Sequence, residues 1–209
     1  MSNYAYRDIE HKSMGGGLNG VPTRKAKNIL REKLDRQLFR HSLGVARMAY
    51  RLAERNGADK RIAYEAGLWH DYGKVYSEQE LRQKASSLGV ELDEVTKHSP
   101  QLLHAPVGAA LLPHEVGIAD ENILQAIRLH TTGAPGMNLL DKIIYLADAV
   151  EPGRNYPGVR KKRHLVFEDL EAALYQVADS SLSLVLERGG LLHPDTVALR
   201  NELLIKYNK

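Results

Sequence analysis

Six side chains of two chemical types are candidates for metal chemistry in this sequence. They are four histidines and two aspartates, located on predicted helices or at helix ends: His41, His70, Asp71, His104, His130 and Asp148. Neutral imidazoles with carboxylates and no sulfur suit iron, manganese or, less specifically, zinc. Six ligands exceed the needs of one tetrahedral zinc ion. The set therefore indicates two metal ions with open positions for water and substrate.

Each of these residues alone has a simpler explanation, as a hydrogen-bonded core histidine or a capping aspartate. The joint pattern favours a metal site. Asp148 lies in the apolar segment 143–150, where a carboxylate needs a cation or a strong set of donors. His70 and Asp71 are adjacent and project about 100° apart on a helix. One of the two can bind one metal while the other bridges toward a second.

The elements that must position these residues are predicted to be helices. Period-two alternation is nearly absent, and apolar residues recur at steps of three and four. We expect an all-α fold, a single helical bundle of about eight or nine helices over residues 23–209. The first helix should run from Thr23 to about Phe39, and Asn138 should cap another. Residues 131–137 and 151–163 are expected to be irregular loops that build the site.

Residues 1–22 include the glycine-containing stretches 15–17 and 20–22 and are expected to be a flexible lead-in or a cloning remnant without a role in the fold. The whole chain has 209 residues, of which 43% are apolar and 26% charged, as in a soluble globular domain. The net charge of +3 indicates no dense cationic surface. The chain has no cysteine, which excludes disulfides, thiolate metal sites and a cysteine nucleophile. We expect a cytoplasmic protein, because no signal segment or membrane span is apparent.

The sequence around the six residues resembles a known family. The segments are LWHDYGK (68–74), LHAPVGA (103–109), IRLHTTG (127–133) and KIIYLADAVEPGR (142–154). With His41, they resemble the HD-domain metal-dependent phosphohydrolases in their six-ligand, dinuclear form. More narrowly, they are similar to the YqeK family of bacterial symmetrical dinucleoside-tetraphosphate hydrolases. The similarity covers about residues 28–204.

This resemblance implies a reaction and indicates which residues would bind each metal ion. The reaction is the hydrolysis of diadenosine tetraphosphate at its centre to two ADP by metal-activated hydroxide. His41, His70, Asp71 and Asp148 would hold one ion, and Asp71 would bridge to a second ion held by His104 and His130. The ions would be divalent or mixed-valence, with iron favoured and manganese or zinc as alternatives.

Other residues near these ligands are candidates for contacts to substrate phosphates. Lys74 follows Asp71 by about one helical turn and is assigned to catalysis with Asp71, although a solvated lysine is the alternative. Arg154 could clamp a phosphate bidentately. The hydroxyls and backbone of Thr131, Thr132 and Gly133 could donate to phosphate oxygens, with a helix-ending turn as the alternative.

Several alternatives for function remain open at this point. The substrate could be another nucleotide, either a mononucleotide or a guanosine polyphosphate, because the ligands alone do not choose between them. A non-catalytic nucleotide sensor would have lost ligands, and none is lost. The basic run 160–163 could bind nucleic acid but is interpreted as a solvated face. We expect a nucleotide substrate and neither a nucleic-acid nor a membrane partner, and the helical faces leave room for a homodimer.

Overall fold

The computed structural model describes residues 23–207, so the prediction for residues 1–22 lies outside the described part of the chain. The prediction of an all-α fold is confirmed: residues 23–207 form helices and no strand. They comprise α1 (Thr23–Lys33), α2 (Arg36–Asn56), α3 (Lys60–Trp69), α4 (Glu78–Ser87), α5 (Glu94–His98), α6 (His104–Glu115), α7 (Glu121–Leu129), α8 (Leu139–Val150), α9 (Val159–Glu168), α10 (Leu170–Glu187) and α11 (Pro194–Tyr207). Two short 3-10 helices, η1 (Tyr72–Val75) and η2 (Pro100–Leu103), connect them. None of the described helices has the length and apolar character needed to cross a membrane.

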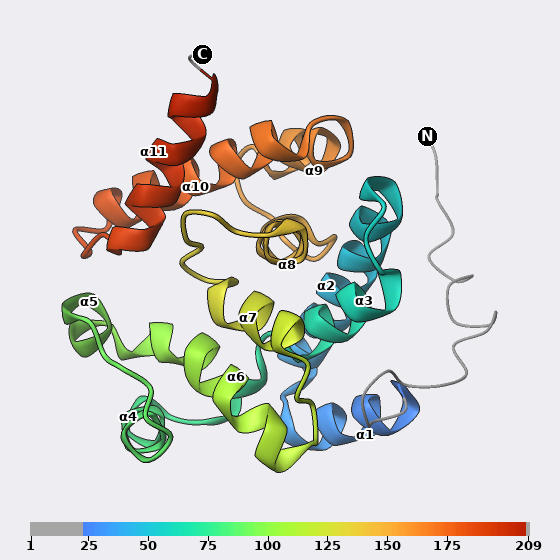
Figure 1. Ribbon diagram of the computed structural model, residues 1–209, viewed down its shortest axis with the longest axis vertical. Helices are drawn as coiled ribbons and strands as arrows, with labels where there is room; N and C mark the ends of the chain where they lie inside the picture. Colours follow the sequence, from blue (N-terminus) through green and yellow to red (C-terminus); the bar gives the residue numbers. More distant parts are fainter. Residues whose placement is uncertain (1–22, 208–209) are drawn as a thin grey trace.

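Helix α8 is the centre of the bundle. Figure 1 shows it end-on, with α2, α7, α9 and α10 arranged around it, and all four contact it. Five consecutive residues, from Ile143 to Ala147, are buried, as expected for a helix that is apolar on all sides. Asn138 begins the helix in a reciprocal capping box with Asp141, which confirms the predicted cap. The packed and capped helix therefore fixes the position of Asp148, which lies in its last turn.

The predicted first helix is wrong at its C-terminal end. Helix α1 ends at Lys33, and Asp35 caps a second helix, α2. The Asp35 side chain accepts a hydrogen bond from the backbone N–H of Leu38. Residues 36–39 therefore belong to α2 rather than to the first helix. Because His41 follows within the same helix, it lies inside a regular helical turn.

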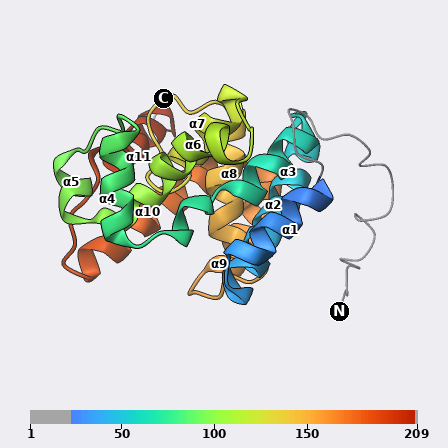
Figure 2. The ribbon, with the colours of Figure 1, turned by 90° about the horizontal axis from the view of Figure 1, so that it is seen from below.

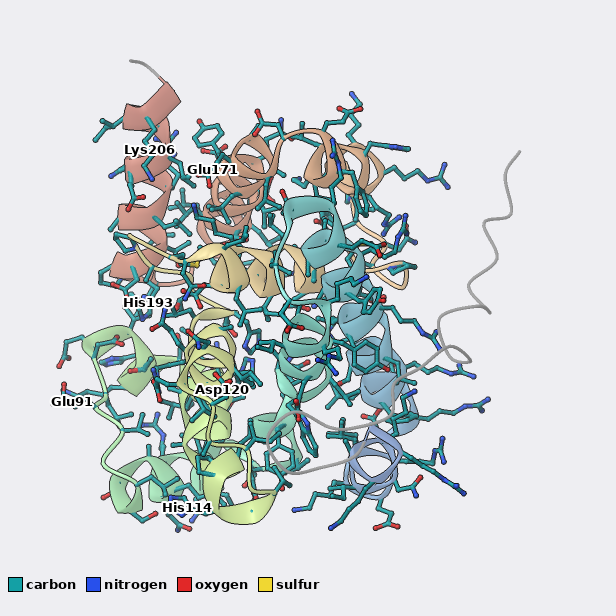
Figure 3. All side chains as sticks on the ribbon, turned by 45° about the vertical axis from the view of Figure 1, so that its right-hand side comes forward. Glu91, His114, Asp120, Glu171, His193 and Lys206 are labelled. Atoms are coloured by element: carbon teal, nitrogen blue, oxygen red, sulfur yellow. The ribbon has the colours of Figure 1, made fainter. Side chains whose placement is uncertain are left out.

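The structure also has more helices than the eight or nine predicted. Helix α9 begins at Val159 and so takes up residues 159–163 of the expected loop 151–163, and α5 is a short helix of five residues. Figure 2 places α4, α5 and α11 at one end of the molecule and α1 and α3 at the other. Asp93, which caps α5, lies 3.2 Å from His193, and Figure 3 shows His193 at the start of α11. These two helices close the end of the bundle far from α1.

A close approach of two backbones sets the position of the segment after Asp71. A Cβ atom on Gly73, in η1, would overlap the carbonyl oxygen of His104 at the start of α6. Only glycine allows η1 to lie this close to α6. This contact brings the His70–Asp71 pair next to His104.

We expect Gly73→Ala to destabilise the protein by about 1–3 kcal/mol, because the opposing atoms are backbone and cannot rotate away. Urea denaturation of the metal-free protein measures this change. Gly190→Ala is the control, since its nearest neighbour is a side-chain methyl of Val185 at 3.1 Å rather than an overlapping backbone atom. Equal stability of the two variants would contradict this account of the η1–α6 contact.

Candidate metal centre

Four histidine side chains direct their Nε2 atoms toward one buried centre. Three of them stand at the ends of helical segments and use Nδ1 in the same way. Each Nδ1 lies 2.5–2.8 Å from the carbonyl oxygen three residues earlier in the chain, in the pairs His70–Gly67, His104–Gln101 and His130–Ile127. A backbone carbonyl at this position keeps the proton on Nδ1 and leaves the Nε2 lone pair free. The local chain thus prepares three imidazoles as metal ligands.

Asp71 lies between two pairs of histidines. Its Oδ2 atom is 3.5 Å from Nε2 of His41 and 3.3 Å from Nε2 of His70. Its Oδ1 atom is 3.5 Å from Nε2 of His104 and 3.4 Å from Nε2 of His130. The two oxygens of one carboxylate therefore face different histidine pairs, which is the geometry of a bridging ligand.

Asp148 completes the pair of His41 and His70. Its Oδ1 atom lies 2.9 Å from Nε2 of His41 and 3.8 Å from Nε2 of His70. Arg154 forms an ion pair with the same oxygen and donates from Nε to the Asp148 carbonyl at 2.8 Å. All six residues chosen from the sequence thus meet at one place, although they come from separate segments of the chain.

Burial and charge together set the protonation of this cluster. Burial opposes ionisation of Asp71, but the nearby His70 and His130 rings and the Lys74 ammonium outweigh it, so the pKa of Asp71 lies well below its ordinary value. Burial, helped by His130, lowers the pKa of His104 to about 3. A neutral imidazole beside an ionised carboxylate is the form that binds a cation.

The residues fit divalent metal ions. Asp71, His70, His104 and His130 are all buried, and Asp71 Oδ1 has no hydrogen-bond donor among the described residues. A buried carboxylate oxygen without a donor is costly unless a cation balances it. Within each of three overlapping groups of these residues, the potential ligand atoms lie within 4.8 Å of one another. Nitrogen and carboxylate donors of this kind suit first-row divalent metals.

The residues predicted to bind phosphate have different positions. Lys74 Nζ lies 2.8 Å from Asp71 Oδ2, so it belongs to the cluster. Thr131 Oγ1 lies 3.1 Å from Nε2 of both His104 and His130. Gly133 donates its N–H to the Leu129 carbonyl at 2.8 Å, so this group ends helix α7 and is engaged there. The Thr132 carbonyl accepts from the Thr196 hydroxyl, which ties that residue to α11. Of these loop residues, Thr131 is the one whose hydroxyl lies beside the histidines of the cluster, and a role of the loop in phosphate binding stays a prediction.

Sequence reasoning missed one residue of the cluster. Glu151 Oε1 lies 3.2 Å from Nδ1 of His41, on the side of the ring opposite to Asp148. Hydrogen bonds to Asp148 and Glu151 more than offset the effect of burial and raise the pKa of His41 to about 9. Glu151 directly follows the α8 segment and precedes Pro152, which looks like an ordinary helix end in the sequence. Its partner is 110 residues away, so no local pattern could reveal it.

Two cavities open beside the cluster, and Arg154 lines both of them. One of about 720 Å³ is lined by His41, Glu151 and four arginines, namely Arg36, Arg40, Arg47 and Arg154. The other, of about 610 Å³, is lined by His130, Thr131, Asp148, Tyr156 and the serine-rich face of α10. Both volumes lie in the range of small-molecule sites, roughly 300–1,000 Å³. The two cavities share Arg154 in their linings, and each is also lined by residues of the histidine and aspartate cluster.

The helical fold, the paired histidines and the shared aspartate define a class of metal-dependent hydrolase. Residues 38–153 match the family model of the HD domain, which is more than half of the chain. The chain therefore belongs to the HD-domain family.

Individual relatives narrow this assignment to the YqeK proteins within that family. The chain is 39% identical to a protein of Halalkalibacterium halodurans, covering 87% of this chain and 97% of the relative. It is 40% identical to a protein of Bacillus subtilis, covering 84% and 94%. Both relatives bear the name "Bis(5'-nucleosyl)-tetraphosphatase, symmetrical".

A solved structure supports the same fold. A protein from Clostridium acetobutylicum, described as a "predicted HD superfamily hydrolase involved in NAD metabolism", is 38% identical. The match has a TM-score of 0.86 and covers 90% of this chain and all of the other. The prediction of an HD-domain bundle is confirmed.

Asp71→Asn should lose at least one bound metal ion per chain, because one amide oxygen cannot replace two charged oxygens facing two histidine pairs. Elemental analysis of the protein after loading with Mn²⁺ measures this loss, and the far-ultraviolet circular dichroism should stay unchanged. Asp195→Asn, at an exposed position in the first turn of α11, is the control and should keep the wild-type metal content. Full metal content in Asp71→Asn would refute a bridging role.

Proposed function

We propose that this protein cleaves diadenosine tetraphosphate at its centre and releases two molecules of ADP. The observation that carries the proposal is the histidine cluster around Asp71, with two cavities beside it that are both lined by Arg154. In a substrate with two nucleoside halves, the central phosphoanhydride would lie at the cluster and each half would enter one of the cavities. The names of the curated relatives support this substrate.

Two divalent metal ions would be held by the six residues of the cluster. His41, His70, Asp71 and Asp148 would hold one, and Asp71, His104 and His130 the other. Iron remains the favoured metal from the family resemblance, with manganese and zinc as alternatives. When bound, such ions supply a nucleophile near neutral pH and offset the charge that develops on the attacked phosphate.

The side chains around the ions would bind and orient the substrate. Lys74 lies next to the shared carboxylate and can donate to an oxygen of the scissile phosphate group. The Thr131 hydroxyl lies next to the second histidine pair and can donate to the same group. Arg154 lines both cavities, so its guanidinium can bind phosphate oxygens on either side of the cleaved bond.

The cavities differ in chemistry, and each suits one half of the substrate. Four arginines surround the larger one, and they can neutralise the phosphates of one departing ADP. The smaller one combines the Tyr156 ring with the apolar side chains of Val177 and Leu184, which can hold a nucleoside. A mononucleotide would leave one of the cavities unfilled, so this geometry favours the dinucleotide.

The basic run 160–163 does not form a continuous cationic face. Arg163 donates to three backbone carbonyls of the segment after α8, and Lys162 is buried against the Tyr156 ring. Only Arg160 and Lys161 of the four are exposed. This arrangement favours a structural role of the run over nucleic-acid binding. A cytoplasmic location and a homodimer stay predictions.

The metal-loaded protein should convert diadenosine tetraphosphate into ADP as the sole nucleotide product. Anion-exchange chromatography of the reaction, with metal analysis of the same sample under anaerobic conditions, tests this outcome. ATP together with AMP would contradict central cleavage. Intact substrate with two metal ions bound would refute this substrate, and GTP, ppGpp and mononucleotides would then be assayed.

Lys74→Ala should keep its metal ions and lower kcat on the order of 10²-fold, because it removes one donor to the developing charge. Steady-state kinetics and metal analysis measure both effects. Lys97→Ala is the matched control, since Lys97 forms a similar i,i+3 ion pair with Glu94, on α5. If Lys74→Ala loses metal instead, Lys74 acts by holding Asp71 in place.

A further inference from the structure

We infer that Glu151 is a positioning residue that orients His41 and gives one of the two metal positions its affinity. The inference rests on the proposed dinuclear site. It concerns a side chain that lies behind the His41 ring, on the Nδ1 side, away from the cluster of metal-ligand atoms. The argument starts from a difference between His41 and the other three histidines.

His41 cannot be oriented by the backbone as the others are. His70, His104 and His130 stand at helix ends, where their Nδ1 atoms reach the carbonyl three residues earlier. His41 lies inside α2, where the carbonyls of the preceding turn are used by the helix itself. The Leu38 carbonyl, three residues before His41, also accepts a bond from the Ser42 hydroxyl. Nδ1 of His41 therefore needs a partner from elsewhere in the chain.

Glu151 supplies this partner from a fixed position. Its Oε1 lies 3.2 Å from Nδ1 of His41, and its Oε2 accepts the Gly153 N–H at 2.6 Å. The residue is only 4% exposed. A Cβ on Gly44, one turn after His41, would overlap Oε2, and a Cβ on Gly153 would lie 2.8 Å from Oε1. Two glycines thus provide the space that a buried carboxylate needs behind the imidazole.

Arg163 holds the segment that carries Glu151. Its Nη2 donates to the carbonyls of Glu151 and Arg154 at 2.9 and 3.0 Å, and its Nε donates to Val150 at 2.7 Å. One guanidinium therefore satisfies the last carbonyl of α8 and two carbonyls of the segment that follows it. These three hydrogen bonds hold the backbone at Glu151, so its carboxylate keeps its direction although the residue lies outside a helix.

The consequence is a difference between the two metal positions. A carboxylate on Nδ1 holds the proton there, orients the ring and makes Nε2 a stronger donor. The metal position at His41 and His70 therefore has three carboxylates close to it, those of Asp71, Asp148 and Glu151. The position at His104 and His130 has only the shared Asp71, and its rings are oriented by backbone carbonyls. Changing Glu151 should weaken the first position and spare the second.

Zinc titration of the full chain tests the inference. Zn²⁺ binding is measured in competition with a fluorescent chelator for the wild type, Glu151→Ala, Glu151→Gln and Glu168→Gln, whose site at the end of α9 is exposed. We expect Glu151→Ala to weaken one of the two ions by about 10- to 100-fold. Glu151→Gln should lie between it and the wild type, because its amide oxygen still accepts a hydrogen bond. Glu168→Gln should match the wild type.

A second readout separates positioning from general support of the fold. Imidazole ¹⁵N–¹H spectra of the zinc-loaded wild type should show a slowly exchanging Nδ1 proton on His41. We expect this signal to be lost in Glu151→Ala and kept in Glu151→Gln. Two tightly bound ions and an unchanged His41 signal in Glu151→Ala would overturn the inference. Equal weakening of both ions, or failure of Glu151→Gln to fold, would also overturn it by indicating a general structural role.

The result does not depend on the substrate. Zinc affinities and imidazole spectra are measured without nucleotide, so an inactive wild type would refute the proposed hydrolase and leave the test of Glu151 intact. Conversely, wild-type hydrolysis with unaltered zinc binding in Glu151→Ala would keep the proposed function and refute the inference.

Discussion

The charge of one buried carboxylate organises this protein. Asp71 is fully shielded from water, yet the His70 and His130 rings and Lys74 lower its pKa and keep it ionised. A charge in such a place is stable only when nearby donors or cations compensate it. The surrounding helices therefore have to bring those groups within a few ångströms from distant parts of the chain. The need to balance this charge connects the fold, the metal centre and the proposed reaction.

The helices meet this need in two ways. Three histidines lie where helices end, and a carbonyl of the same helical turn fixes each ring. The fourth, His41, lies within a helix and relies on Glu151 from the segment after α8. The central helix α8 supplies both Asp148 and, just past its end, this carboxylate. The ring orientations of His70, His104 and His130 are therefore set by local backbone, whereas the orientation of His41 depends on packing between distant segments.

The segment after α8 links the metal centre to the cavities. Arg154 pairs with Asp148 and lines both cavities, while Arg163 anchors the backbone on which Arg154 and Glu151 stand. The ion pair with Asp148 also preorganises Arg154 before any phosphate arrives, which reduces the entropy lost on binding. The same few residues thus contribute to ligand geometry and to the shape of the proposed substrate site.

The sequence alone determined the helical class, the cap at Asn138 and the six metal-ligand candidates, because helix periodicity, capping and residue type are local properties. It could not place the break at Asp35, since the apolar pattern runs through it, nor helix α9, because its charged sequence resembles a loop. Tertiary structure alone decided which oxygen of Asp71 faces which histidine pair. It also decided that Thr131 reaches the cluster while Gly133 ends a helix, and that Glu151 lies behind His41. These are contacts between segments up to 110 residues apart, and their distances depend on how helices pack, which no local pattern encodes.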